Sequence, residues 1–254
     1  MAPRNHLIIA GAQRSGTTLV YHLLDKHPNI LMARPVKPEP KFFLKEEEYL
    51  LGYEHYLKYY FGGKSKFTWY GEKTTSYMEF KEVPSKIRSI IPNASVIFIL
   101  RNPVYRAISN YYFSLKNNLE SRSIEEVFLK QTPAPKIDTN ISAPPFNYIE
   151  RGVYLPYLKN YYKHFPADQI KILILERLLS VSSEEFSSLF DHLKLNPPEA
   201  SQEILNKKIN SNIMDYDSLR IGSIINKLND IYKKSIEELE QYTNIDLSIW
   251  KISS

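Results

Sequence analysis

The sequence predicts an α/β protein of the phosphate-loop type, with a central parallel β-sheet flanked by helices and a largely helical C-terminal third. Short apolar runs alternate along the chain with longer segments of helical pattern. The clearest run, residues 95–100, is apolar almost throughout, as expected of a strand whose two faces are both covered. A turn containing two glycines joins the first apolar run to a helix. We expect a single domain spanning residues 1–254.

Apolar runs and helical patterns place the individual elements. Strands are expected at residues 7–10, 30–32, 67–72, 95–100 and 170–175. Helices are expected to begin at residue 19 and to cover residues 46–61, 84–91, 103–118, 151–164 and 218–242. Residues 132–147 contain four prolines among polar residues, which indicates a loop or flap without regular structure. We find no internal repeat.

The composition excludes several classes of protein. The chain has no cysteine, so disulfides, thiol nucleophiles and cysteine metal sites are absent. The net charge is +5, but no dense block of Lys and Arg indicates a nucleic-acid partner. Residues 1–6 lack a signal-peptide pattern, and no run approaches the roughly 20 apolar residues that a membrane helix needs. We expect a soluble cytoplasmic protein without a membrane partner, and the alternative is a lumenal domain of a longer protein.

The turn after the first apolar run has the spacing of a phosphate-binding loop, with Gly11 and Gly16 separated by four residues. Glycines let the backbone turn sharply and expose its N–H groups, and the helix N-terminus that follows adds a partial positive charge. Nucleotide triphosphatases continue this loop with Lys, but here Thr17 and Thr18 follow and the cation is Arg14, inside the loop. The pattern favours a donor less charged than a triphosphate. The alternative is an ordinary turn between a strand and a helix.

A second cationic position follows the strand at residues 95–100. Arg101 should emerge at the carboxyl edge of the sheet, where ligands bind in this class of fold, and Ser109 lies about two helical turns later. Together an Arg and a hydroxyl can bind a second phosphate. The alternative is an Arg bonded to helix C-terminal carbonyls, with Ser109 in solvent. No Asp stands at this strand end to hold Mg²⁺, so we expect no metal.

Four ordered segments carry a resemblance to a known family. They are the loop at residues 11–18, Glu39–Phe43, Gly71–Tyr77 and Leu100–Tyr111, and residues 151–176 extend the match. These segments resemble sulfotransferases that use 3′-phosphoadenosine 5′-phosphosulfate (PAPS), and they are most similar to the branch of heparan-sulfate and bacterial sulfotransferases. The resemblance is specific for the family but not for the acceptor.

The resemblance implies how the donor is bound. In the family's pattern, the loop from Gln13 to Thr18 holds the 5′-phosphosulfate, Arg14 lies near the bridging oxygen, and Arg101 and Ser109 bind the 3′-phosphate. The residues assigned to the donor are Gln13, Arg14, Ser15, Gly16, Thr17, Thr18, Arg101, Ser109, Lys207 and Lys208. Lys207 and Lys208 stand where the family often closes a basic loop over the nucleotide. For these two residues a solvated run of charge is the favoured alternative.

The resemblance also assigns catalytic roles to Glu39, Lys73 and Arg14. Glu39 matches a general base, and Lys73 matches a Lys that faces the sulfuryl group. The chain departs from the branch at Pro38, where Lys is usual, and at Lys41, where His is frequent. The alternatives are an exposed Glu39 or a Glu39–Lys41 pair, and a structural pair of Lys73 with a neighbouring Glu. Several histidines, among them His6 and His22, are weaker candidates for a base.

The expected function is therefore in-line transfer of a sulfuryl group from PAPS to an acceptor hydroxyl, on a carbohydrate or a small metabolite. Negative charge builds on the leaving oxygen, where backbone N–H groups and cations stabilise it. A carboxylate takes the proton of the acceptor hydroxyl. Two rivals remain open: a P-loop kinase or other nucleotide-dependent phosphotransferase, and a non-catalytic nucleotide-binding module. The sequence does not indicate the oligomeric state.

Overall fold

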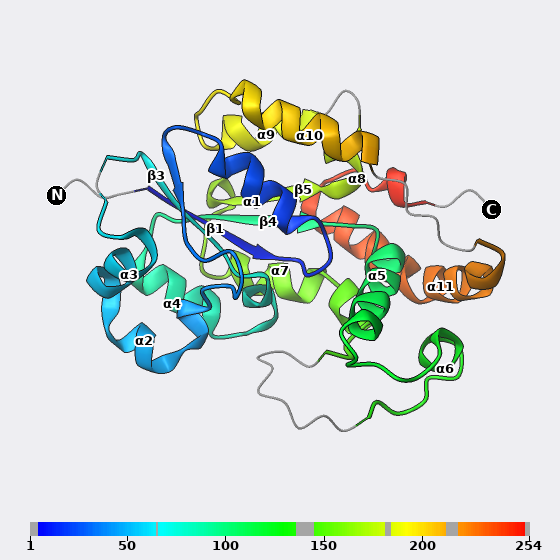
Figure 1. Cartoon of the computed structure of the whole chain (residues 1–254). Helices are drawn as coiled ribbons and strands as arrows, with labels where there is room; N and C mark the ends of the chain where they lie inside the picture. Colours follow the sequence, from blue (N-terminus) through cyan, green and yellow to red (C-terminus); the bar gives the residue numbers. More distant parts are fainter. Residues whose placement is uncertain (1–4, 65, 136–144, 181–183, 212–217, 252–254) are drawn as a thin grey trace. The chain divides into compact units, whose positions relative to one another are not determined.

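The computed structural model describes residues 5–64, 66–135, 145–180, 184–211 and 218–251. Five parallel strands form one sheet in the order β2-β3-β1-β4-β5 (Figure 1). The strands are β1 (Asn5–Gly11), β2 (Ile30–Met32), β3 (Trp69–Lys73), β4 (Ser95–Leu100) and β5 (Ile170–Ile174). The predicted α/β class with a parallel central sheet is confirmed.

Within their described ranges, the residues form two compact units, each with its own core. The first comprises residues 1–100 and 157–211, and the second comprises residues 101–156 and 212–254. The helices of the first unit are α1 (Thr17–Asp25), α2 (Glu46–Leu50), α3 (Gly52–Phe61), α4 (Val83–Ile90), α8 (Leu175–Leu178), α9 (Glu184–His192) and α10 (Glu199–Ser211). Helix α7 (Leu155–Tyr162) begins in the second unit and ends in the first. The single-domain interpretation stays a prediction.

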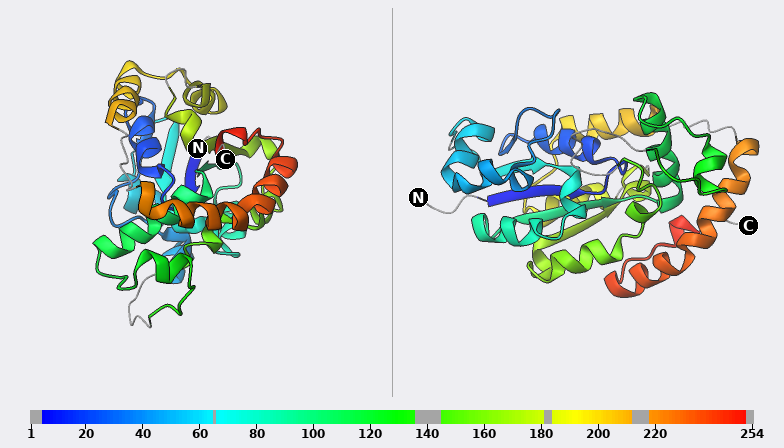
Figure 2. Two further views of the ribbon diagram at one scale, coloured as in Figure 1. Left: turned by 90° about the vertical axis from the view of Figure 1, so that its right-hand side faces the viewer. Right: turned by 90° about the horizontal axis from the view of Figure 1, so that it is seen from below.

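Helices cover both faces of the sheet in the first unit (Figures 1 and 2). Side chains alternate between faces along a strand, so Ile9 and Ile97 pack with α1, α9 and α10 on one face. On the other face, the ring of Phe98 meets that of Tyr161 from α7, with centroids 4.8 Å apart. Burial on both faces explains why the strands are continuously apolar.

The second unit is built around α5 (Pro103–Lys116), α6 (Ile124–Phe128) and α11 (Ser218–Thr243), and α11 lies beside α5 in Figures 1 and 2. Helix α5 begins where the sequence predicts, because the Asn102 side chain accepts a hydrogen bond from the Val104 N–H (3.0 Å) and Pro103 occupies the first helical position. The core of this unit joins α5, α6 and α11, with Ile108, Phe128 and Leu228 fully buried.

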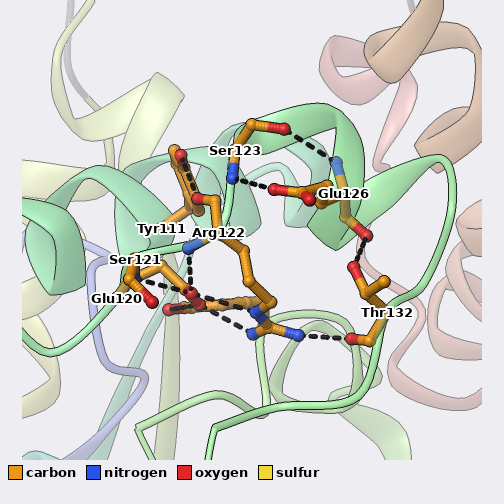
Figure 3. Close-up of polar contacts among 8 residues, drawn as sticks. Tyr111, Glu120, Ser121, Arg122, Ser123, Glu126 and Thr132 are labelled. Carbon is orange, nitrogen blue, oxygen red and sulfur yellow. Dashed lines mark hydrogen bonds and ion pairs between the residues drawn. The ribbon is translucent and has the colours of Figure 1, made fainter.

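A buried carboxylate organises the segment between α5 and α6 (Figure 3). Glu120 accepts hydrogen bonds from the backbone N–H groups of Ser121 (3.0 Å) and Arg122 (2.9 Å) and from the Arg122 guanidinium. Tyr148 donates a further hydrogen bond to Glu120 over 3.0 Å. The same guanidinium donates to the carbonyl of Thr132 over 2.5 Å. Arg122 therefore binds the first residue of the Pro-rich segment, Thr132, and Glu120 binds the residue that follows the segment, Tyr148.

Several predicted boundaries differ from the structure. The helix expected at residues 46–61 is two helices, because the backbone of Gly52 has φ 74° and interrupts the helical path. The helix expected from residue 151 begins at Leu155, after a 3₁₀ turn over Glu150–Gly152. Lys73 is the last residue of β3 rather than the residue after it. Of the Pro-rich loop predicted at residues 132–147, residues 136–144 lie outside the described ranges.

Candidate active site

The phosphate loop joins the end of β1 to the start of α1. Gly16 is the N-cap of α1 with φ 81°, in the left-handed region that glycine adopts without strain. A Cβ atom on Gly11 would lie 2.8 Å from the Cβ of Met78, in the 3₁₀ turn that follows β3. This turn packs too closely against Gly11 to leave room for a larger residue. Backbone geometry thus explains both glycines of the sequence motif.

The loop offers several groups to an anion. The first turn of an α-helix leaves its N–H groups without intrahelical partners, and these groups carry a partial positive charge. Among the residues described, the Oγ atom of Ser15 is one of the few buried side-chain oxygens without a hydrogen-bond partner. Thr17 is buried, whereas Arg14 and Thr18 are exposed. An orphaned hydroxyl, a helix N-terminus and a cation fit the phosphate end of a nucleotide.

Glu39 and Lys73 meet next to this loop. The Nζ atom of Lys73 lies 2.5 Å from Oε1 of Glu39. Lys73 ends β3, pairs in register with Ile9 of β1, and is followed by Thr74, whose N–H donates to the Ile9 carbonyl over 3.1 Å. The ion pair therefore lies at the same carboxyl edge of the sheet from which the phosphate loop arises.

Further hydrogen bonds fix the carboxylate of Glu39. Its Oε2 atom accepts from the Thr75 backbone N–H (2.9 Å) and from the Thr75 hydroxyl (3.1 Å). The Lys73 side chain is 3% exposed, while that of Glu39 is 18% exposed. Lys73 thus pairs with Glu39 rather than with Glu72 or Glu79, and Glu39 keeps access to solvent. A held but accessible carboxylate can accept a proton from a bound hydroxyl.

Arg101 and Ser109 belong to the second unit. Arg101 directly follows the last residue of β4, and its carbonyl accepts a hydrogen bond from the Tyr154 hydroxyl over 2.7 Å. Ser109 is buried in the middle of α5. Their convergence with the phosphate loop on one nucleotide stays a prediction.

Lys207 and Lys208 do not lie on a loop. Both are exposed residues of helix α10, which packs on α1 through a hydrogen bond from the Ser201 hydroxyl to the Leu23 carbonyl (2.6 Å). The expectation of a basic loop at these positions is wrong, because the segment has a continuous helical pattern. Exposed lysines on a helix agree with the alternative of a solvated run of charge.

Two of the histidines that are candidates for a base, His6 and His22, have the following surroundings. His6 begins β1 at the opposite end of the strand from the phosphate loop, and its Nε2 atom lies 3.0 Å from the Tyr53 hydroxyl. His22 is exposed on α1. Neither observation favours a role as the base.

The sequence did not reveal the network behind the ion pair. Glu72 is fully buried and accepts hydrogen bonds from the hydroxyls of Tyr56 (2.9 Å), Thr74 (2.7 Å) and Tyr77 (2.6 Å). Burial raises the pKa of Glu72 from 4.5 to about 7, although the three hydrogen bonds oppose this shift. In the sequence, Glu72 is recognisable only as a Glu inside an apolar strand, where it is an alternative partner of Lys73.

Comparison with known proteins decides the family. A sequence model of the sulfotransferase domain matches residues 4–238. The chain belongs to the sulfotransferase family. This match runs through both compact units and includes every residue that we assigned to the site.

Two curated relatives of this sulfotransferase are heparan sulfate glucosamine 3-O-sulfotransferases. It is 31% identical over 189 residues to human heparan sulfate glucosamine 3-O-sulfotransferase 3B1, covering 74% of this chain and 45% of that protein. It is 31% identical over the same length to human heparan sulfate glucosamine 3-O-sulfotransferase 3A1, covering 74% and 44%. The chain thus spans about half the length of the curated relatives it matches.

Solved structures agree with the fold of this sulfotransferase. The sulfotransferase from Alicyclobacillus acidocaldarius has a TM-score of 0.73 and 21% identity, covering 97% of this chain and 98% of that one. Mouse sulfotransferase SULT7A1, solved in complex with PAP, has a TM-score of 0.54 and 13% identity, covering 95% and 86%. These likenesses show the fold.

Two absences concern the described residues alone. No group of three or more His, Cys, Asp or Glu side chains is placed there to hold a metal ion. In the same residues, no helix is long and apolar enough to cross a bilayer. Metal independence and a cytoplasmic location stay predictions.

Proposed function

We propose that this sulfotransferase transfers the sulfuryl group of PAPS to the hydroxyl of a carbohydrate acceptor. The observation that carries the proposal is the 2.5 Å ion pair between Glu39 and Lys73 beside the phosphate loop. A base and a cation at the phosphate end of a nucleotide site are what sulfuryl transfer needs.

The donor is held by the groups described above. The N-terminus of α1 and the orphaned Ser15 hydroxyl receive the 5′-phosphate, and Arg14 lies in the loop beside it. Arg101 and Ser109 are assigned to the 3′-phosphate, which would distinguish PAPS from ATP. A bidentate guanidinium suits such a terminal phosphate.

The reaction follows from the chemistry of these side chains. Glu39 accepts the proton of the acceptor hydroxyl as its oxygen forms a bond to sulfur. The bond between sulfur and the bridging oxygen of the 5′-phosphate breaks, and its electron pair stays on the product 3′-phosphoadenosine 5′-phosphate (PAP). Lys73, Arg14 and the loop N–H groups stabilise the charge that develops on the sulfuryl and bridging oxygens.

A carbohydrate acceptor is favoured over a small metabolite by the relatives named above, which act on heparan sulfate glucosamine according to their names. Lys41 stands two residues after Glu39 and is half-buried. It adds a cation near the base, where an anionic sugar would gain from it.

Calorimetric titration tests the donor assignment directly. We expect metal-independent binding of PAP that is much tighter than binding of adenosine 5′-monophosphate, because the latter lacks the 3′-phosphate. Transfer of radioactive sulfate from PAPS to desulfated heparan oligosaccharides, compared with simple alcohols and phenols, then tests the acceptor. A preference for ATP with Mg²⁺ would favour the kinase alternative. Tight PAP binding without transfer to any acceptor would favour the non-catalytic alternative.

A further inference from the structure

The segment that carries Glu39 is held by two hydroxyl groups. The backbone N–H of Lys41 donates to Oγ1 of Thr74 over 3.1 Å, and the backbone N–H of Phe43 donates to the Tyr77 hydroxyl over 3.1 Å. These contacts join residues 33 and 34 positions apart in the sequence, from the loop after β2 to the residues after β3. The position of the Glu39 segment therefore depends on both hydroxyls.

Both hydroxyls are oriented by the same buried carboxylate. Thr74 and Tyr77 each donate their single hydroxyl hydrogen to Oε1 of Glu72, at 2.7 and 2.6 Å. Because these hydrogens are committed to Glu72, the oxygen lone pairs face the amides of Lys41 and Phe43. Burial raises the pKa of Tyr77 well above 10, so its hydroxyl keeps this hydrogen at neutral pH.

We propose that Thr74 and Tyr77, both anchored on Glu72, are positioning residues that hold Glu39 beside Lys73 and the acceptor hydroxyl. The proposal rests on the proposed function of Glu39 as the general base. None of the three residues needs to touch the substrate, since their effect passes through the backbone of residues 41–43. Small displacements of a reacting group are costly, and roughly a 100-fold loss follows a misplacement of about 1 Å.

Substitutions at Thr74 separate the hydroxyl from the shape of the side chain. Thr74→Val removes the hydroxyl and keeps the shape, whereas Thr74→Ser keeps the hydroxyl. We expect Thr74→Val to lower kcat by roughly 10- to 100-fold, with the KM for PAPS and the Kd for PAP changed by less than about twofold. Thr74→Ser should retain most of the activity. Equal losses in the two variants would overturn the proposal.

A double variant tests whether the effect passes through Glu39. In the Glu39→Gln background, adding Thr74→Val should slow transfer no further, because the group that it positions is already absent. Adding Tyr77→Phe to Glu39→Gln should likewise slow transfer no further. If Thr74→Val slows the Glu39→Gln enzyme by the same factor as the unsubstituted enzyme, its role is independent of Glu39 and the proposal fails.

Hydrogen exchange tests the geometry without any activity. In the ¹⁵N-labelled protein, Thr74→Val should accelerate exchange of the Lys41 amide, and Tyr77→Phe that of the Phe43 amide, while the amide of Val96 in β4 is unchanged. Unchanged exchange at residues 41 and 43 would contradict the proposed contacts. If the unsubstituted protein transfers no sulfate, the proposed function fails, and exchange still decides whether the hydroxyls hold the segment.

Discussion

The Nζ atom of Lys73 and the Oε1 atom of Glu39 lie 2.5 Å apart, although 34 positions of sequence separate the two residues. Lys73 ends an inner strand of the sheet, and Glu39 lies in the loop that leaves the edge strand β2. The pair thus joins the end of a strand to a loop, and loops positioned by a rigid scaffold often carry the functional groups of a protein.

Removal of the Glu39 carboxylate should slow transfer without weakening donor binding. Glu39→Gln keeps the size of the side chain but abolishes its basicity, and general-base help is typically worth about 10²- to 10⁴-fold. We expect a loss of that order in kcat and a Kd for PAP within about twofold of the unsubstituted value. Glu47→Gln, at an exposed position on α2, is the matched control. Undiminished turnover in Glu39→Gln would exclude Glu39 as the base.

Arg101 should contribute to donor binding through the 3′-phosphate alone. A hydrogen bond to a charged group is worth about 1.5–3 kcal/mol, so Arg101→Ala should raise the Kd for PAP by roughly 10- to 100-fold. The Kd for adenosine 5′-monophosphate should not change. Titration of both nucleotides measures the difference, and Lys116→Ala on the exposed end of α5 serves as the control. An equal effect on both nucleotides would point to a structural role for Arg101.

The stability of the first unit should fall as the pH rises through the pKa of Glu72. Burial raises this pKa from 4.5 to about 7, so the protonated form is favoured in the folded state. The contribution of protonated Glu72 to the free energy of unfolding is complete below about pH 4.5 and is lost as the pH rises through about 7. Relative to Glu72→Gln, the free energy of unfolding of the unsubstituted protein should decrease over this range by on the order of 3 kcal/mol. Urea unfolding at a series of pH values measures it, and a difference independent of pH would contradict the shift.

The contribution of Glu120 to stability should have the opposite pH dependence. Burial alone would raise its pKa, but the hydrogen bonds from Arg122 and Tyr148 outweigh burial and hold the pKa below 4.5. Its contribution to stability is present above pH 4.5 and is lost as the pH falls. Glu120→Gln should destabilise the second unit by about 1.5–3 kcal/mol at pH 7 and by less in acid. Glu237→Gln, at an exposed position on α11, should change stability by less than about 0.5 kcal/mol in the same urea titrations.

The parts of the fold with strong local signals could be predicted from the sequence. The strand at residues 95–100 and the start of α5 at Pro103 are confirmed, because a continuous apolar run and a capping Asn before Pro are both local. The break at Gly52 was missed, since a single glycine is tolerated inside many helices and only the backbone angle shows the interruption. Lys207 and Lys208 lie on helix α10, where the family resemblance suggested a basic loop, and their contact with the nucleotide stays a prediction.

The sequence indicates which residues are candidates for the site, but it does not show how they are arranged in space. The motifs named Glu39 and Lys73 separately, and their contact depends on how the loop after β2 crosses the end of β3. The burial of Glu72 could not be predicted from the sequence, for a physical reason. A carboxylate within a strand is normally solvated, and only the three hydroxyls that surround this one make its burial tolerable.

The first strand of the chain occupies the middle of the sheet. Its register pairs Asn5 with Trp69 of β3 and Leu7 with Ser95 of β4, so every partner of β1 is synthesised long after it. Contacts of such long sequence separation form slowly, because the loop-closure entropy must be overcome first. The phosphate loop at the end of β1 therefore leaves the ribosome before either neighbouring strand, and it acquires its final shape only after both have been synthesised.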